Sequence, residues 1–160
     1  MVALEPVDVA DPRARALLAD YFAMRSQTFP SGPDGRTYRP AFPEAAVFTP
    51  PAGVFLVLVD DDGRDAGCGG IRRLDDGPHG IRYEIKHLYV APSTRGRGWG
   101  RLLLEGLEER ARDLGARELV LDTHHTLEAA AALYARSGYT ATAPYNDNPN
   151  ATVWLRKILS

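Results

Sequence analysis

Apolar and polar residues alternate at the start of the chain and then change to a helical period. Val2 to Val9 alternates as a short strand does, and Asp11-Pro12 supplies a helix N-cap followed by proline at the first helical position. From Ala14 to Phe22, leucine and aromatic residues recur at helical spacing. This pattern predicts a strand followed by an amphipathic helix that ends near Ser26.

The segment from Pro30 to Pro51 differs in composition from its surroundings, because six of the twelve prolines fall within it. It predicts a long loop with a short helix at Glu44 to Phe48. Long ordered loops in compact domains are more often functional than idle, although a mobile surface segment is the alternative.

The rest of the chain shows two hairpins and then alternating strands and helices. Asp60 to Gly63 and Asp75 to Pro78 are the expected hairpin turns, and Gly115 and Gly138 are placed to end helices. Strands are expected at Val54–Val59, Ala66–Leu74, Arg82–Val90, Glu118–Thr123, Tyr139–Thr142 and Ala151–Ile158, and helices at Trp99–Leu114 and Leu127–Ser137. The order predicts an α+β fold, with residues 1–160 forming a single domain.

Composition and charge exclude several classes of protein. With 44% hydrophobic and 25% charged residues, 160 residues can bury a real core. A net charge of -2 and a pI near 6.1 do not suit a nucleic-acid partner. Met1 to Ala10 has no apolar signal core, and no stretch approaches the roughly 18 apolar residues of a membrane span. We therefore expect a soluble cytoplasmic protein without a membrane partner.

Cysteine and histidine usage predicts no metal. Cys68 is alone, so it has no intrachain disulfide partner, and it is most simply a buried apolar residue. The pair His124-His125 has no clustered further ligands and is expected to be a loop feature.

The most informative segment runs from Arg95 to Arg101 and reads R-G-R-G-W-G-R. It lies between a predicted strand and a predicted helix, where glycines and free helical N–H groups favour an anion. Its spacing matches neither the dinucleotide fingerprint nor the ATP-binding loop. Judged from these residues alone, the segment is either a site for a pyrophosphate-like anion or a glycine-rich turn with solvated arginines.

Two motifs resemble the GCN5-related N-acetyltransferase (GNAT) superfamily. Its acetyl-CoA signature, R/Q-x-x-G-x-G/A at a strand-to-helix junction, is matched by Arg95, Gly98 and Gly100. Its helix pattern A-x-x-L-Y-x-x-x-G-F/Y is matched by Ala130–Tyr139. One position departs from the pattern. Leu127 stands where relatives often carry an Asn or Gln that hydrogen-bonds the cofactor, so another residue, His125 or Thr126, is expected to supply that hydrogen bond.

The resemblance implies a mixed, mostly antiparallel central sheet flanked by helices, with a splayed strand pair binding acetyl-CoA. The two splayed strands are expected to open a wedge between Leu88–Val90 and the strand at Leu121. The Val90 N–H is expected to stabilise an oxyanion. The implied cofactor-binding residues are Leu88, Tyr89, Val90, Arg95, Gly96, Arg97, Gly98, Trp99, Gly100 and Arg101.

Two residues are candidates for catalysis, and each has a structural alternative. Glu84, on the strand before the glycine loop, is the candidate base, and otherwise it is a solvated or ion-paired carboxylate. Tyr134 is the candidate acid by resemblance, since a phenol stays protonated at pH 7, whereas an aromatic residue on a helix face is otherwise core.

The implied function is acetyl-CoA-dependent N-acetyl transfer to a primary amine of a small molecule or a peptide, directly and in a ternary complex. A non-catalytic acyl-CoA sensor and a longer acyl group are the alternatives, and a homodimer is left open. The turn from Tyr145 to Asn150 and the loop from Pro30 to Phe48 are expected to cap the acceptor pocket. Lys86 and His87 line that pocket or coat the sheet, while Arg72 and Arg73 meet an acidic substrate group or are solvated.

Overall fold

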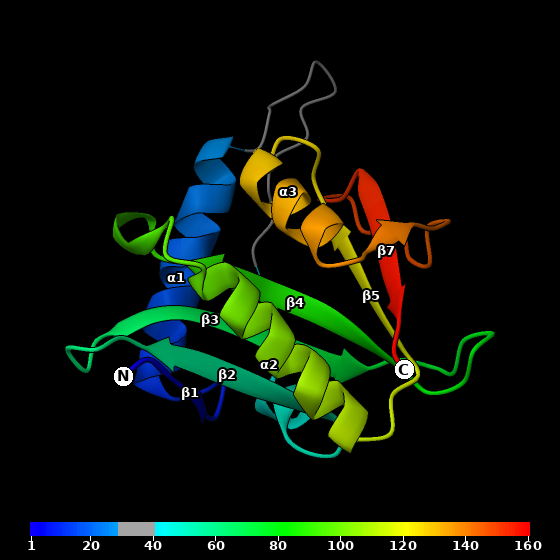
Figure 1. Cartoon of the computed structure of the whole chain (residues 1–160), viewed down its shortest axis with the longest axis horizontal. Helices are drawn as coiled ribbons and strands as arrows, with labels where there is room; N and C mark the ends of the chain where they lie inside the picture. Colours follow the sequence, from blue (N-terminus) through cyan, green and yellow to red (C-terminus); the bar gives the residue numbers. More distant parts are fainter. Residues whose placement is uncertain (29–40) are drawn as a thin grey trace.

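The computed structural model describes residues 1–28 and 41–160, and within these ranges seven strands form one sheet. The spatial order is β1-β2-β3-β4-β5-β7-β6, and every pairing is antiparallel except β4 with β5 (Figure 1). The strands are β1 (Ala3–Pro6), β2 (Gly53–Val59), β3 (Asp65–Arg73), β4 (Arg82–Val90), β5 (Glu118–Thr123), β6 (Thr140–Ala141) and β7 (Val153–Ile158). The helices are α1 (Pro12–Thr28), α2 (Trp99–Asp113) and α3 (Glu128–Arg136), with short 3-10 helices η1 (Ala45–Phe48) and η2 (Pro92–Thr94). The predicted fold class is confirmed.

Local signals set the ends of several elements. Asp11 accepts a hydrogen bond from the N–H two residues later, at 2.8 Å, and so caps α1 as expected. Gly115 and Gly138 have φ of 87° and 90°, the left-handed conformation that ends a helix. The first strand is shorter than predicted, because the Asp8 carboxylate accepts the N–H of Ala10 and begins a turn.

The predicted proline-rich loop is described only in part. Residues 29–40 lie outside the described residues, and so does that part of the prediction. Beyond them, η1 forms at Ala45–Phe48, where a short helix was predicted.

Two apolar cores lie on opposite faces of the sheet, one under α2 and one under α1 (Figure 1). On the first, Leu103 and Leu107 of α2 pack with Ile85 of β4. The second includes Leu18 of α1 and Cys68, which is fully buried as predicted. No helix in the described part of the chain is both long enough and apolar enough to cross a membrane.

The parallel strands β4 and β5 separate halfway along their length. They pair only through Arg82–Glu84 and Glu118–Val120. Beyond this point β4 stays paired with β3 as far as Val90, and β5 stays paired with β7 as far as Thr123. The second half of β4 therefore has an edge that no described strand occupies, which confirms the predicted wedge.

Candidate active site

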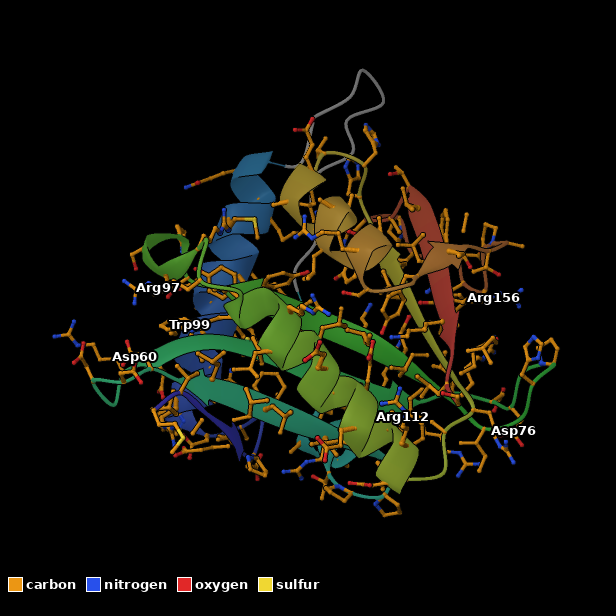
Figure 2. The ribbon with its side chains drawn as sticks, viewed as in Figure 1. Asp60, Asp76, Arg97, Trp99, Arg112 and Arg156 are labelled. Atoms are coloured by element: carbon orange, nitrogen blue, oxygen red, sulfur yellow. The ribbon has the colours of Figure 1, made fainter. Side chains whose placement is uncertain are left out.

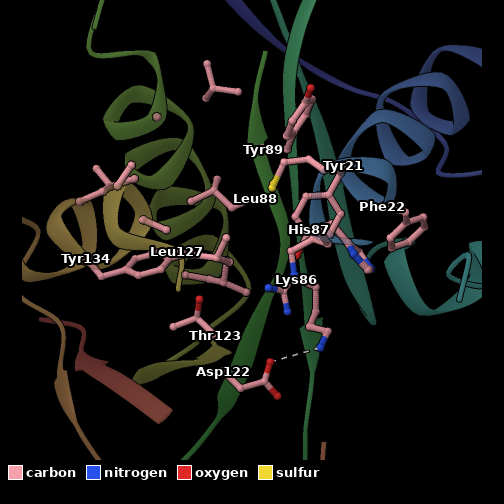
Figure 3. Close-up of a pocket in the computed structure, with 18 of the residues that line it drawn as sticks. Tyr21, Phe22, Lys86, His87, Leu88, Tyr89, Asp122, Thr123, Leu127 and Tyr134 are labelled. Atoms are coloured by element: carbon pink, nitrogen blue, oxygen red, sulfur yellow. Dashed lines mark ion pairs between the residues drawn. The ribbon is translucent and has the colours of Figure 1, made fainter. Parts of the chain in front are cut away.

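A cavity of about 1,320 Å³ fills the wedge between β4 and β5. One wall combines β4, the glycine loop, the start of α2 and α3, and the other combines α1 with residues 41–48. Figure 3 shows Leu88, Leu127 and Tyr134 on one side of β4, with Tyr21 and His87 on the other. The cavity is large enough for a cofactor and a second substrate together.

The glycine loop leaves backbone donors free at one end of this cavity. Gly96 and Gly98 have φ of 87° and 77°, and a Cβ on either would meet no atom within 4 Å. The first backbone bond of α2 is donated by Leu102 to Gly98, so the preceding N–H groups have no helical partner. Arg95 lines the cavity and forms no ion pair with any described residue. This arrangement suits a phosphate-bearing ligand.

Two of the predicted loop arginines contact other side chains of the protein. Arg97 is not among the residues that line the cavity, and its guanidinium lies 5.2 Å from the centre of the Trp99 ring (Figure 2). Arg101 lines the cavity and is paired with Glu105 at 2.9 Å. The other predicted cofactor-binding residues all lie on the cavity wall.

A bulge in β4, which the sequence did not predict, aims its residues at the cavity. Lys86 pairs with Gly70 and Tyr89 pairs with Cys68, so His87 and Leu88 together stand opposite one residue of β3. His87 has φ of 59°. Leu88, within the bulge, packs against the α2 core, and Tyr89, the next residue, packs against the α1 core.

The backbone of β4 offers N–H groups to the cavity after the bulge. The Ala91 N–H donates to the Ala66 carbonyl at 2.8 Å, on the β3 side. Because successive strand N–H groups point in opposite directions, the Val90 N–H faces away from β3 and towards the wedge. This is the orientation that the expected oxyanion donor needs.

Tyr134 lies on the cavity wall with its side chain largely enclosed. It is 6% exposed, and its ring meets that of Tyr139 edge-on at 5.8 Å. Its hydroxyl has no hydrogen-bond partner among residues 1–28 and 41–160. Burial, with a contribution from the charge of Asp122, raises the pKa of Tyr134 above its usual value. The group is therefore a neutral proton donor with an unused O–H.

Glu84 lies behind the wall rather than on it. Its side chain is fully buried and is not among the residues that line the cavity. Arg72 Nε lies 2.7 Å from Oε1, and the Tyr145 hydroxyl donates to Oε2. Burial, and then the charge of Glu84, raises the pKa of Tyr145. The two predicted catalytic side chains thus have different access to the cavity.

Asp122 is a carboxylate that the sequence interpretation missed and that does line the cavity. Oδ2 accepts hydrogen bonds from the amides of Asn146 and Asn148 at 2.7 and 3.1 Å. Oδ1 lies 3.6 Å from Lys86 Nζ, the ion pair dashed in Figure 3. The sequence feature that could have identified Asp122 is its position directly after the apolar run Leu119–Leu121. An acidic residue on a buried strand is rarely enclosed unless it is paired. Asn146, Asn148 and Asn150, in the turn predicted to cap the acceptor pocket, also line the cavity.

His87 is held neutral beside two cations. Burial, followed by the charges of Lys86 and Arg72, lowers the pKa of His87 to about 3. Its ring lies within 6 Å of three aromatic rings, those of Tyr21, Phe22 and Phe48. The wall is therefore apolar and aromatic next to charged groups.

The α3 end of the cavity contains the departure from the family pattern. Thr126 and Leu127 line the cavity, and His125 is not among the lining residues. His124 and His125 stack at 4.4 Å. Among the residues that the structure describes, no group of three His, Cys, Asp or Glu side chains is placed to hold a metal ion.

Known proteins are similar to this chain in sequence and in fold. The model of the acetyltransferase (GNAT) family matches residues 15–139. An uncharacterized N-acetyltransferase of Schizosaccharomyces pombe is 38% identical over 111 residues, which are 69% of this chain and 66% of that protein. The chain thus matches just under two thirds of the length of this relative.

Two solved structures show the same fold. An acetyltransferase of the GNAT family from Staphylococcus aureus superposes with a TM-score of 0.79 at 14% identity, covering 100% of both chains. A GNAT family acetyltransferase from Elizabethkingia anophelis, solved with acetyl-CoA bound, gives 0.63 at 16% identity and covers 99% of this chain and 98% of its own.

Proposed function

The chain belongs to the acetyltransferase (GNAT) family, and we propose that it is an N-acetyltransferase that moves an acetyl group from acetyl-CoA to a primary amine. The observation that carries this proposal is the cavity in the β4–β5 wedge, which joins the glycine loop to the carboxylate of Asp122. It accounts for a phosphate-bearing donor at one end and an acceptor at the other. The amine belongs to a small molecule or a peptide.

The residues of the cavity fit the proposed cosubstrate. Gly96, Gly98 and the start of α2 present N–H groups to its phosphates, and Arg95 adds charge-assisted hydrogen bonds. The unpaired edge of β4 at Leu88–Val90 offers strand-like hydrogen bonds to the amide-containing arm of coenzyme A.

The proposed reaction is a direct transfer in a ternary complex. The amine nitrogen attacks the thioester carbonyl, the N–C bond forms, and the C–S bond breaks. The Val90 N–H stabilises the oxyanion, and Tyr134 donates a proton to the leaving sulfur. The products are an amide and free coenzyme A.

Two carboxylates are proposed as the acceptor of the amine proton. Glu84 was predicted from the sequence, but its side chain is fully buried and does not line the cavity, so it would act only through a neighbouring group. Asp122 lies on the cavity wall, and we place the role there. Comparing the pH–rate profiles of Asp122→Asn and Glu84→Gln separates the two, since only the loss of the true base removes the acidic limb.

The function is tested by following thiol release from acetyl-CoA with and without a panel of primary amines. The proposal expects release that depends on the amine, with an acetylated product detected by mass spectrometry. Tight binding of acetyl-CoA without amine-dependent release would instead identify a sensor of the same fold. Replacing acetyl-CoA by longer acyl-CoA thioesters in the same assay measures the acyl preference.

A further inference from the structure

Two cations from neighbouring strands line the acceptor end of the cavity. Arg72 comes from β3 and Lys86 from β4. In the β3–β4 register, Arg72 stands opposite Glu84 and Gly70 opposite Lys86. Residues two apart on a strand share a face, so both cations project from the same side of the sheet. Arg73, the next residue of β3, does not line the cavity.

Each cation is held in place by a carboxylate that is itself enclosed. Arg72 Nε pairs with Glu84, whose side chain is 0% exposed, and Lys86 pairs with Asp122, whose side chain is 5% exposed. Asn146 donates to Asp122 at 2.7 Å and approaches Glu84 at 3.5 Å, so one side chain bridges the two carboxylates. The four charges therefore form one fixed cluster.

Arg72 keeps most of its hydrogen-bonding capacity for a ligand. Only Nε is used, and the two Nη groups make no hydrogen bond to any residue that the structure describes. The side chain is 38% exposed on the cavity wall. A guanidinium with its outer nitrogens open presents the fork that binds a carboxylate in bidentate fashion.

The surface beside this cluster is apolar. Phe42, Val47 and Phe48 line the same cavity, and the neutral ring of His87 lies against Phe48. A ligand that meets both parts would carry an anionic group at one point and an apolar group at another. The carboxylate of Asp122, at the same end of the cavity, carries the negative charge that attracts a cationic group.

From this juxtaposition we infer that the acceptor is a zwitterionic α-amino acid with an apolar side chain, which deepens and rests on the proposed acetyl transfer. Its carboxylate binds Arg72 and Lys86, and its amine lies towards Asp122, where the transfer begins. Glu84 is then a positioning residue that orients Arg72. Arg72 and Lys86 determine specificity.

The test compares amino acids with the amines that lack only the carboxylate. Thiol release from acetyl-CoA is measured with L-phenylalanine, L-leucine and L-methionine, and with phenethylamine, isoamylamine and 3-(methylthio)propylamine. A bidentate charge-assisted contact predicts a kcat/KM ratio of roughly ten- to a hundredfold in favour of each amino acid. A ratio near one, or one that favours the amines, overturns the inference while the proposed function stands.

Three variants test which residues produce the preference in kcat/KM for an amino acid over the matching amine. Arg72→Met is combined with Glu84→Gln, because an unpaired buried carboxylate would endanger folding. Lys86→Met is tested alone, since Asp122 keeps two amide donors. Arg73→Met is the matched control, since Arg73 pairs with Asp76 outside the cavity.

The inference expects the ratio to fall at least tenfold in the double variant, to fall less in Lys86→Met, and to keep its wild-type value in Arg73→Met. An unchanged ratio in both cavity variants would refute it. Should the double variant fail to fold, Lys86→Met alone decides. No thiol release with any amine, while acetyl-CoA still binds, would overturn the proposed function and the inference with it.

Discussion

Removing the hydroxyl of Tyr134 separates catalysis from structure. In Tyr134→Phe the ring keeps its edge-on contact with Tyr139, and the lost hydroxyl had no partner among the described residues. The free energy of unfolding should therefore change by less than about 1 kcal/mol, or by no more than about 4 °C in melting temperature. The proton donor, in contrast, is lost completely.

The expected kinetic loss follows from the chemistry of the leaving group. General acid catalysis contributes about 10²–10⁴-fold, and a thiolate is a better leaving group than most, so the lower end is expected. A hundredfold fall in kcat corresponds to about 2.7 kcal/mol in the barrier. Because burial raises the pKa of Tyr134, wild-type kcat should show no loss from this group up to about pH 10.

The assay follows thiol release at saturating acetyl-CoA and amine, beside a calorimetric titration of acetyl-CoA into each protein. In Tyr134→Phe, kcat should fall while the Kd of acetyl-CoA changes little. A kcat within about threefold of wild type would refute the assignment of Tyr134 as the acid, as would a loss that appears only in Kd.

Three further changes test the structural account. The pKa of His87 is about 3 in the folded protein and about 6.5 in the unfolded chain. Between these values only the unfolded chain binds a proton at this residue, so the free energy of unfolding is undiminished well above pH 6.5 and decreases as pH falls towards 3. Between pH 7.5 and 5 wild type should lose about 1–2 kcal/mol in urea unfolding, and His87→Asn, which tolerates left-handed backbone, should lose correspondingly less. Lys157 lies 3.1 Å from the buried carboxylate of Glu108, so Lys157→Met should lower the melting temperature by roughly 4–12 °C. Adding Glu108→Gln to Lys157→Met should recover at least half of that loss. Equal melting temperatures of the single and the double variant would contradict this. Gly98→Ala should weaken acetyl-CoA binding tenfold or more by calorimetry, whereas Gly63→Ala, at nearly the same φ of 78° but outside the cavity, should cost similar stability without changing Kd.

Periodic patterns predicted the elements well because their causes are local. The apolar stripe of α2 ends at Gly115, as expected, and the helix packs with that stripe on the sheet. Boundaries were wrong where a side chain or a turn competes with the strand. Asp8 ends β1 early, and the Ala151 N–H bonds to the Asn148 carbonyl, so β7 begins later than predicted.

Features that depend on pairing between distant segments were not predictable in the same way. The bulge at His87 exists only because β3 offers one residue opposite two of β4. The Asp122 cluster joins residues 24 and 26 positions apart, through Asn146 and Asn148. No periodicity records either arrangement.

The glycine loop shows both the strength and the limit of motif reasoning. The patterns on either side of it correctly predicted a strand-to-helix junction, and the structure shows that this junction lines the cavity. A motif does not say which way an exposed arginine turns, and Arg97 stacks on Trp99 instead of lining the wall. Likewise, the sequence left Arg72 and Arg73 equivalent, and only the packing distinguishes them.

The measurement that tests the central claim most directly is the melting temperature of the purified protein with acetyl-CoA, free CoA, ATP and NAD. A ligand at 100 times its Kd stabilises a protein by about 2.7 kcal/mol, which raises the melting temperature of a domain of this size by roughly 5–11 °C. The account predicts such a rise with acetyl-CoA and CoA alone. No rise with either, or an equal rise with ATP or NAD, would contradict the assignment of the wedge as an acetyl-CoA site.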